Sequence, residues 1–423
     1  MNAHRPEVAD VISQYGEAFL KRWGHTVSPQ QRKAIRDIVA CRTAALGGHI
    51  KRCDNCAHQS IAYNSCRNRH CLDQRRRRNV GLIRISLAML LRLWSCQSSA
   101  RDRWLAERAK ELLPVPYSHV VFTVPERLAP LILQNQRVFY GLLFRAVSET
   151  LLEIAADPKH LGARIGILAV LHTWSQNLLH HPHIHCVVPA GGLAPDGSRW
   201  IRCRRRFFLP VRVLSRLFRG KLLAFLRDAF ARGRLRFSGQ LAGFASPARF
   251  QSWLRTFKKS DWVIYAKPPF GGPAHVLKYL ARYRHRVAIS NGRLLSCEQG
   301  RVTFRWRDSK DNNRPKVMSL DAVEFIRRFL IHILPPGFVK IRHFGFLANR
   351  KRSVQLYLCR KLLNAPAPAE PAPGILTDRQ TQTAERRCPE CRTGILRIVG
   401  RISSDDLLII RRNVPVICQI DSS

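Results

Sequence analysis

Four cysteines lie within nineteen residues of one another, and this cluster constrains the fold of the chain more than any other feature. Cys53 and Cys56 form a CxxC pair, and Cys66 and Cys71 follow. In a reducing compartment this spacing is typical of tetrahedral zinc, because a tight turn holds two thiolates and a second pair closes the site. His70 competes with Cys71 for the fourth position, but adjacent residues rarely both bind one ion. The alternative is a set of buried free thiols. Because of the spacing, we predict structural zinc at the four cysteines.

A second CxxC pair, Cys388 and Cys391, lies in the C-terminal part of the sequence. A lone pair needs two more ligands, and only Cys418 or residues far away in the sequence remain to supply them. The sequence therefore allows a second zinc site at this pair without identifying its other ligands.

The chain is strongly basic: it has 72 Lys and Arg residues against 28 Asp and Glu residues, a formal surplus of +44, and 46% of its residues are hydrophobic. The hydrophobic content is that of a folding chain, which excludes a disordered polycation. Because the basic residues are spread along the chain, the pattern favours nucleic acid over a membrane surface. The arginines that flank the cysteine cluster are predicted to contact DNA: Arg67, Arg69, Arg75 and Arg76.

The sequence predicts no targeting or membrane segment. The first residues, Met1–Arg22, mix charged side chains with no apolar core segment. The most apolar helical stretch, Leu82–Trp94, is interrupted by arginines and is too short to span a bilayer. We expect a cytoplasmic, nucleoid-associated bacterial protein with no membrane partner.

Hydrophobic periodicity predicts an α+β chain. Helices are expected up to about residue 50, with a capped start at Ser28, and over 129–156, 210–260 and 321–334. Strands are expected over 118–124, 165–173, 184–189, 286–290, 292–297 and 301–306. The predicted domains are a helical zinc-binding, DNA-contacting domain over 1–113, a second domain over 114–363, a Pro/Ala linker over 364–375 and a small tail over 376–423.

His183 and His185 alternate on a predicted strand, so both imidazoles leave the same face of the sheet. Two imidazoles on one face form half of a divalent metal site, and a pair of surface histidines is the alternative. Gln176, seven residues before His183, is the predicted third ligand. His180 and His181 are assigned to the preceding turn.

Tyr279 and Tyr283 stand one turn apart on one face of a predicted helix. Alone they would be the edge of an amphipathic helix, but together with a metal site they fit attack on a phosphodiester. A phenol with a pKa near 10 is a poor nucleophile, so a divalent ion on the phosphate is needed to stabilise the developing charge. Attack would leave a 5′-phosphotyrosine and a free 3′-OH. Basic residues on or near this helix are predicted to hold phosphates, with a solvated basic face as the alternative: Lys278, Arg282 and His285.

Several linked motifs resemble those of known families. The run TWSQNLLHHPHIHC at 173–186 resembles the HUH motif of rolling-circle nucleases. The order of the motifs is similar to that of the two-tyrosine transposases of the insertion sequence ninety-one family. Further runs resemble that family: CRTAALGGH at 41–49, NSCRNRHC at 64–71, YLARYRHRVAIS at 279–290 and IRHFGFLANR at 341–350. The resemblance extends over nearly the whole chain to about Leu363.

This resemblance implies an HUH core of antiparallel sheet flanked by helices, with Mg²⁺ or Mn²⁺ bound by His183 and His185. It implies Tyr279 and Tyr283 as nucleophiles, and single-stranded DNA at transposon ends and target DNA as partners. It indicates transposition through single-stranded or circular intermediates, and it indicates no oligomeric state. The chain departs from the family after Cys71, where Leu-Asp-Gln stands in place of Pro-x-Cys, and this affects the zinc ligand set.

Three other functions fit the sequence less well. A plasmid replication initiator or relaxase would use the same chemistry, but no helicase or primase segment is visible. A non-enzymatic zinc-finger nucleic-acid-binding protein would explain the charge and the cysteines, but it leaves the histidine and tyrosine pairs as coincidence. A three-carboxylate transposase is poorly supported, because no spaced acidic triad stands in a strand–helix setting.

Overall fold

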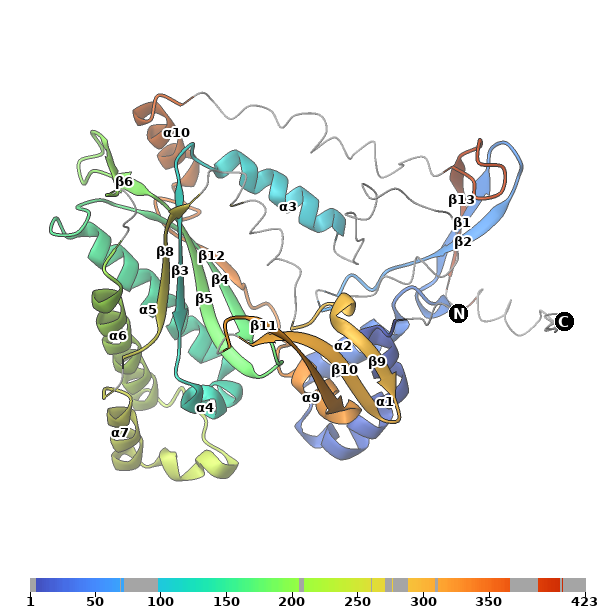
Figure 1. The fold of residues 1–423 in the computed structure, drawn as a ribbon, viewed down its shortest axis with the longest axis horizontal. Helices are drawn as coiled ribbons and strands as arrows, with labels where there is room; N and C mark the ends of the chain where they lie inside the picture. Colours follow the sequence, from blue (N-terminus) through green and yellow to red (C-terminus); the bar gives the residue numbers. More distant parts are fainter. Residues whose placement is uncertain are drawn as a thin grey trace. The chain divides into compact units, whose positions relative to one another are not determined.

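The computed structural model describes residues 5–68, 70–71, 98–204, 209–259, 261–270, 276, 288–308, 311–365, 387–403 and 405. The fold is α+β, as predicted, with helices and antiparallel sheets (Figure 1). The chain forms two compact units, each built from separate segments. Unit 1 comprises the described residues of Met1–Arg103, Ile289–Arg327 and Pro373–Ser423, and unit 2 those of Trp104–Ala288 and Arg328–Ala372. Among the described helices, none has both the length and the apolar character needed to cross a membrane.

The described part of unit 1 combines α-helices with two three-stranded sheets. Helix α2 begins at the predicted cap: the Ser28 hydroxyl accepts a hydrogen bond from the Gln31 amide at 3.3 Å, and the Gln31 side chain accepts one from the Ser28 amide at 2.8 Å. The helices are α1 (Val8–Trp23) and α2 (Pro29–Ala40). One sheet has the order β13-β1-β2, with β1 (Gly48–Cys53), β2 (Gln59–Tyr63) and β13 (Leu396–Ile402). The other has the order β11-β10-β9, with β9 (Leu294–Glu298), β10 (Arg301–Asp308) and β11 (Arg314–Asp321), and α9 (Ala322–Leu330) follows it.

The units differ from the predicted domains, which are continuous in sequence. Residues 289–327 and the C-terminal tail belong with the N-terminal residues. The tail joins them because β13 pairs with β1. The middle segment joins them through contacts such as the hydrogen bond of 3.2 Å from the Val8 amide to Asn291 Oδ1. Such long-range pairing leaves no local pattern in the sequence.

Unit 2 is built around a five-stranded antiparallel sheet of order β12-β4-β5-β3-β8, so β5 is the central strand. Its strands are β3 (Tyr117–Thr123), β4 (Gly166–Trp174), β5 (His180–Pro189), β8 (Ile264–Phe270) and β12 (Ile341–Gly345). A short hairpin joins β6 (Gly191–Leu193) to β7 (Trp200–Arg202). The helices around it are α3 (Ser98–Glu111), α4 (Ala129–Gln134), α5 (Gln136–Ala156), α6 (Val211–Ala231), α7 (Pro247–Thr256) and α10 (Arg352–Leu362).

The two faces of this sheet have different partners. Side chains that alternate with the histidines of β5, among them Ile184 and Cys186, are fully buried in the main hydrophobic core. This core includes the long helices α5 and α6, and Phe122 of β3 meets Phe218 of α6 edge to face with ring centroids 5.1 Å apart. The other face carries His183 and His185.

Some predicted elements were wrong in detail. Strand β5 begins at His180, so His180 and His181 belong to the strand and not to the turn; His180 Nε2 lies 3.0 Å from the buried Tyr140 hydroxyl. The described part of the strand predicted over 286–290 is irregular, because Ala288 has a φ of 53°. Strand β8 was not among the predicted strands. It carries two prolines, which are tolerated because it lies at the sheet edge.

Candidate metal centres

Two histidines of β5 face a third histidine on the neighbouring strand. His183 lies opposite His172 of β4 in the antiparallel register, and opposed residues project to the same face. His185 follows two positions later on that face. One ring nitrogen from each of the three imidazoles lies within 4.8 Å of the others, so the three can bind one ion.

Hydrogen bonds orient two of these rings. His183 Nδ1 lies 2.7 Å from the His181 carbonyl oxygen. Because a carbonyl only accepts, Nδ1 carries the proton and the Nε2 lone pair is left for a metal ion. His185 Nδ1 lies 2.9 Å from Nε2 of His119 on β3, and the two rings stack with centroids 5.1 Å apart. Metal-binding histidines typically use one ring nitrogen for the ion and the other for such an orienting partner.

Burial keeps these imidazoles neutral. Desolvation lowers the pKa of His183 to about 4. Desolvation, together with the charges of the neighbouring histidines, lowers the pKa values of His172 and His185 well below the ordinary value. The neutral imidazole is the form that binds a metal ion. The charge state and the geometry of the group therefore both fit a cation.

The same sheet face becomes apolar beyond the histidines. Leu168 of β4 lies opposite Val187 of β5, and both belong to a buried cluster that includes Val276. Val276 is only 2% exposed and lies three positions before Tyr279 in the sequence. Val276, Leu168 and Val187 also line one small pocket. Val276 is thus anchored on the histidine-bearing face of the sheet.

The structure describes some of the remaining predicted site residues and not others. Gln176 is exposed in the turn between β4 and β5. The sequence pattern missed His172, although it lies on a correctly predicted strand, since only the register of β4 against β5 brings it opposite His183. The predicted nucleophiles and phosphate-binding residues lie outside the described residues: Lys278, Tyr279, Arg282, Tyr283 and His285.

The cysteines form two clusters instead of the single predicted site. In each cluster the sulfur atoms lie within 4.8 Å of one another. The first cluster consists of Cys53, Cys56, Cys388 and Cys391. The second consists of Cys41, Cys66 and Cys71. The prediction combined half of one cluster with two thirds of the other, because nearness in sequence does not reveal which strands pair.

The second cluster needs a fourth ligand to form a tetrahedral zinc site. His70, the predicted competitor of Cys71, is buried, and its Nδ1 lies 3.2 Å from the Asn68 side-chain oxygen. His49 lines a pocket together with Cys66, and its buried Nδ1 has no hydrogen-bond partner among the described residues. Neither His49 nor His70 places a ring nitrogen in the group of ligand atoms that lie within 4.8 Å of one another.

The predicted DNA contacts near the cysteines are described only in part. Arg67 is exposed, has a φ of 52° and lines the pocket that also contains Arg401 of β13. Arg69, Arg75 and Arg76 lie outside the described residues.

Two protein families match the chain. Residues 166–354 match the family described as "Putative transposase", and this segment contains the three histidines. Residues 11–92 and 94–124 match the family described as "Transposase zinc-binding domain". The matched residues include all the cysteines from Cys41 to Cys71. This match and the cysteine clusters support structural zinc in the N-terminal region. No solved structure matches the chain.

Relatives with transposase names match over most of the chain. It is 52% identical over 396 residues to "Putative transposase y4qJ" of Sinorhizobium fredii, which covers 92% of this chain and 94% of that protein. It is 27% identical over 352 residues to "Transposase for insertion sequence element IS801" of Pseudomonas savastanoi pv. phaseolicola. This match covers 78% of this chain and 74% of that protein. The chain therefore belongs to the transposases of the insertion sequence ninety-one family and carries the zinc-binding domain of that family.

Proposed function

We propose that this transposase nicks and rejoins single-stranded DNA at element ends by metal-assisted tyrosine attack, as an HUH two-tyrosine enzyme. The observation that carries the proposal is the group of three imidazoles, two buried and one half-buried, on the sheet face that also anchors Val276. A DNA-processing function follows from the family, and the proposal concerns the chemistry and the DNA form.

The position of Val276 supports Tyr279 and Tyr283 as nucleophiles. Val276 packs with Val187, which lies two positions after His185 on the same face of β5. In the predicted helix, positions three and seven residues after Val276 lie on the same side as Val276 itself. Such a helix would direct both phenols toward the sheet face that carries the histidines.

The donor set favours one kind of metal ion over another. His172, His183 and His185 would hold the ion. Gln176, which is exposed in the turn between β4 and β5, stays a predicted ligand. A divalent ion held there would withdraw negative charge from the scissile phosphate and align it for attack. Imidazole donors suit transition metals better than Mg²⁺, which prefers oxygen donors. We therefore expect Mn²⁺ to support the reaction better than Mg²⁺.

The covalent step balances without an external reactant. The tyrosine oxygen bonds to phosphorus while the bond from phosphorus to the 3′ oxygen breaks. The phenolic proton ends on the released 3′-OH, and the 5′-phosphotyrosine conserves the bond for rejoining. A pair of tyrosines allows a second strand transfer before the first product is released. Phosphates are proposed to be held by basic residues of both domains: Arg67, Arg69, Arg75, Arg76, Lys278, Arg282 and His285.

The test is formation of a covalent protein–DNA adduct. The purified protein is incubated with labelled single-stranded oligonucleotides covering the element ends, with Mn²⁺, Mg²⁺ or EDTA, and run on a denaturing gel. We expect an adduct that needs metal and disappears in the Tyr279→Phe/Tyr283→Phe double variant and in His183→Ala/His185→Ala. The matched control is Tyr357→Phe, because Tyr357 lies on α10 and is 72% exposed.

Two outcomes would contradict the proposal. One is an adduct that persists in the double tyrosine variant, which would assign the nucleophile elsewhere. The other is DNA binding by the folded protein with no adduct on any end sequence and any metal.

A further inference from the structure

The C-terminal segment forms part of the zinc-binding region in the structure. Strand β13 runs antiparallel to β1, with Gly48 opposite Ile402 and Cys53 opposite Leu396. Figure 1 shows β13 (red) beside β1 (blue), although they come from opposite ends of the sequence. The strand pairing brings the loop that precedes β13 to the loop that follows β1.

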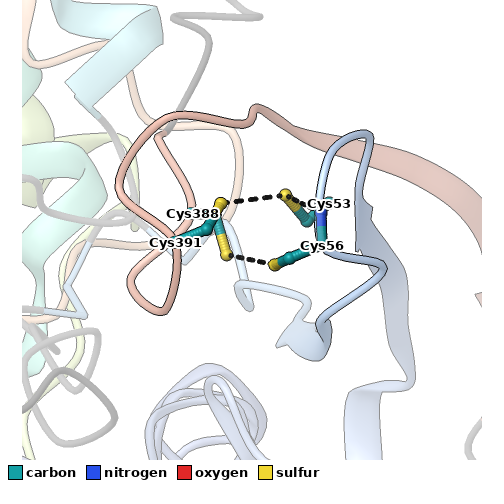
Figure 2. Close-up of side chains that lie close together, drawn as sticks. All are labelled: Cys53, Cys56, Cys388 and Cys391. Carbon is teal, nitrogen blue, oxygen red and sulfur yellow. Dashed lines mark hydrogen bonds between the residues drawn. The ribbon is translucent and has the colours of Figure 1, made fainter.

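These two loops each contain a CxxC pair, and the pairs face each other (Figure 2). The Sγ atoms of Cys53 and Cys391 are 3.7 Å apart, and those of Cys56 and Cys388 are 3.5 Å apart. Tetrahedral zinc with bonds of about 2.3 Å to sulfur places its sulfur atoms about 3.8 Å from one another. The sulfur spacing of the four cysteines is therefore close to that of a zinc tetrathiolate.

The two loops also have similar backbone features. The residue after the second cysteine of each loop is left-handed: Ala57 has a φ of 57° and Arg392 a φ of 60°. In each loop a backbone amide points at the sulfur of one cysteine. The Cys56 amide lies 3.5 Å from Cys53 Sγ, and the Gly394 amide lies 3.3 Å from Cys391 Sγ. Amide hydrogens directed at sulfur stabilise thiolates, the form that binds metal.

Residues between the cysteines lock the loops together. Asp54 Oδ1 accepts a hydrogen bond from the Ile395 amide at 2.7 Å, and the Asn55 side-chain amide donates to Thr393 Oγ1 at 3.0 Å. A Cβ atom on Gly394 would lie 2.4 Å from Cys53 Sγ, so the close approach requires glycine there. These contacts orient the sulfur ligands independently of an ion.

We propose that Cys53, Cys56, Cys388 and Cys391 bind one structural zinc ion, closing a site from the two ends of the sequence. The tail pair, Cys388 and Cys391, lies outside the residues that match the zinc-binding family. Cys388 follows Cys56 by 332 positions in the sequence. The C-terminal segment is thus a structural part of the zinc-binding domain. This ion is distinct from one at Cys41, Cys66 and Cys71.

Metal content of cysteine variants tests the shared site. Zinc and iron per chain are measured by mass spectrometry of the full-length protein for Cys53→Ser/Cys56→Ser, Cys388→Ser/Cys391→Ser and the fourfold variant. We expect each pair variant to lose one zinc equivalent and the fourfold variant to lose the same single equivalent. Cys297→Ser is the matched control, since Cys297 belongs to unit 1 but to neither cluster, and it should lose none. Three results would overturn the proposal. They are a loss of two zinc equivalents in the fourfold variant, an unchanged zinc content in the Cys388→Ser/Cys391→Ser variant, and iron in place of zinc.

A measurement on the unmodified protein separates loss of the site from misfolding of a variant. The zinc-loaded chain is treated with N-ethylmaleimide before and after zinc removal by a chelator, and each cysteine is followed by peptide mass spectrometry. In the zinc-loaded protein we expect Cys388 and Cys391, like Cys53 and Cys56, to react at least tenfold more slowly than Cys297. Removal of zinc should abolish this protection. Reaction of the tail pair at the rate of Cys297 in the zinc-loaded protein would refute the site.

Discussion

His172 of β4 lies opposite His183 of β5 in the central sheet, and their ring centroids are 5.3 Å apart. This relationship turns a pair of imidazoles on one strand into a group of three. Since His172 is 3% exposed, desolvation favours its neutral form, and the ring is held among its neighbours before any ion binds.

His172→Ala should weaken metal binding more than Gln176→Ala. Loss of one of three nitrogen donors removes a direct ligand, so we expect Mn²⁺ affinity to fall by well over tenfold and the DNA adduct to fall with it. Gln176 is exposed, and its replacement should change affinity by less than threefold. Calorimetric titration with Mn²⁺ measures both variants. The reverse order of effects would make Gln176 the third ligand.

His119→Phe should weaken metal binding by tenfold to a hundredfold without abolishing the reaction. Phenylalanine keeps a ring beside His185 but removes the nitrogen that lies 2.9 Å from His185 Nδ1. Loss of such an orienting partner typically costs that factor in affinity. The Mn²⁺ dependence of adduct formation should shift to higher concentration and reach the level of the unmodified protein at saturation. An unchanged Mn²⁺ dependence would show that His119 does not position His185.

Gly345→Ala should destabilise unit 2 by more than about 2 kcal/mol. Gly345 ends β12 with a φ of 62°, and a Cβ atom there would lie 1.8 Å from the Ile165 carbonyl oxygen. The control is Gly141→Ala on α5, where a Cβ meets nothing within 4 Å. The control should stabilise the protein by about 0.5–1 kcal/mol, because alanine is the better helix former. Urea unfolding curves compare the two, and equal midpoints would contradict the expectation.

The stability of unit 2 should fall as the pH is lowered from about 6.5 toward 4. Burial lowers the pKa of His180 to about 3 and that of His332 to about 4. Since both folded-state values lie below the unfolded value near 6.5, the unfolded state binds more protons in this range and acid favours it. Each such histidine contributes a slope of about 1.4 kcal/mol per pH unit.

Urea unfolding of the metal-free protein at several pH values from 7 to 5 measures this slope. His332→Gln removes a buried titrating group. The slope of the unfolding free energy against pH should therefore fall by the contribution of one histidine. His25→Gln, at an exposed histidine of unit 1, is the matched control for the substitution itself. A stability that does not depend on pH in this range would contradict the expectation.

The sequence by itself determined the features that depend on neighbouring residues. Ser28 caps α2 because its hydroxyl is within reach of an amide three positions on. The strands around His183 and His185 follow from β-branched residues and alternation, and the period of two dictates that both imidazoles share one face. The family resemblance likewise rests on contiguous motifs, and the comparisons confirmed it.

Only the tertiary structure decided which distant residues meet. The register of β4 against β5 selects His172 as the partner of His183, and no spacing along the chain specifies that register. The pairing of β13 with β1 joins Cys388 and Cys391 to Cys53 and Cys56, and leaves Cys66 and Cys71 to Cys41. Strand pairing depends on burial and hydrogen bonding summed over whole sheets, whereas a motif records only its immediate neighbours. The chemistry of each ligand was therefore readable from the sequence, but the grouping of the ligands was not.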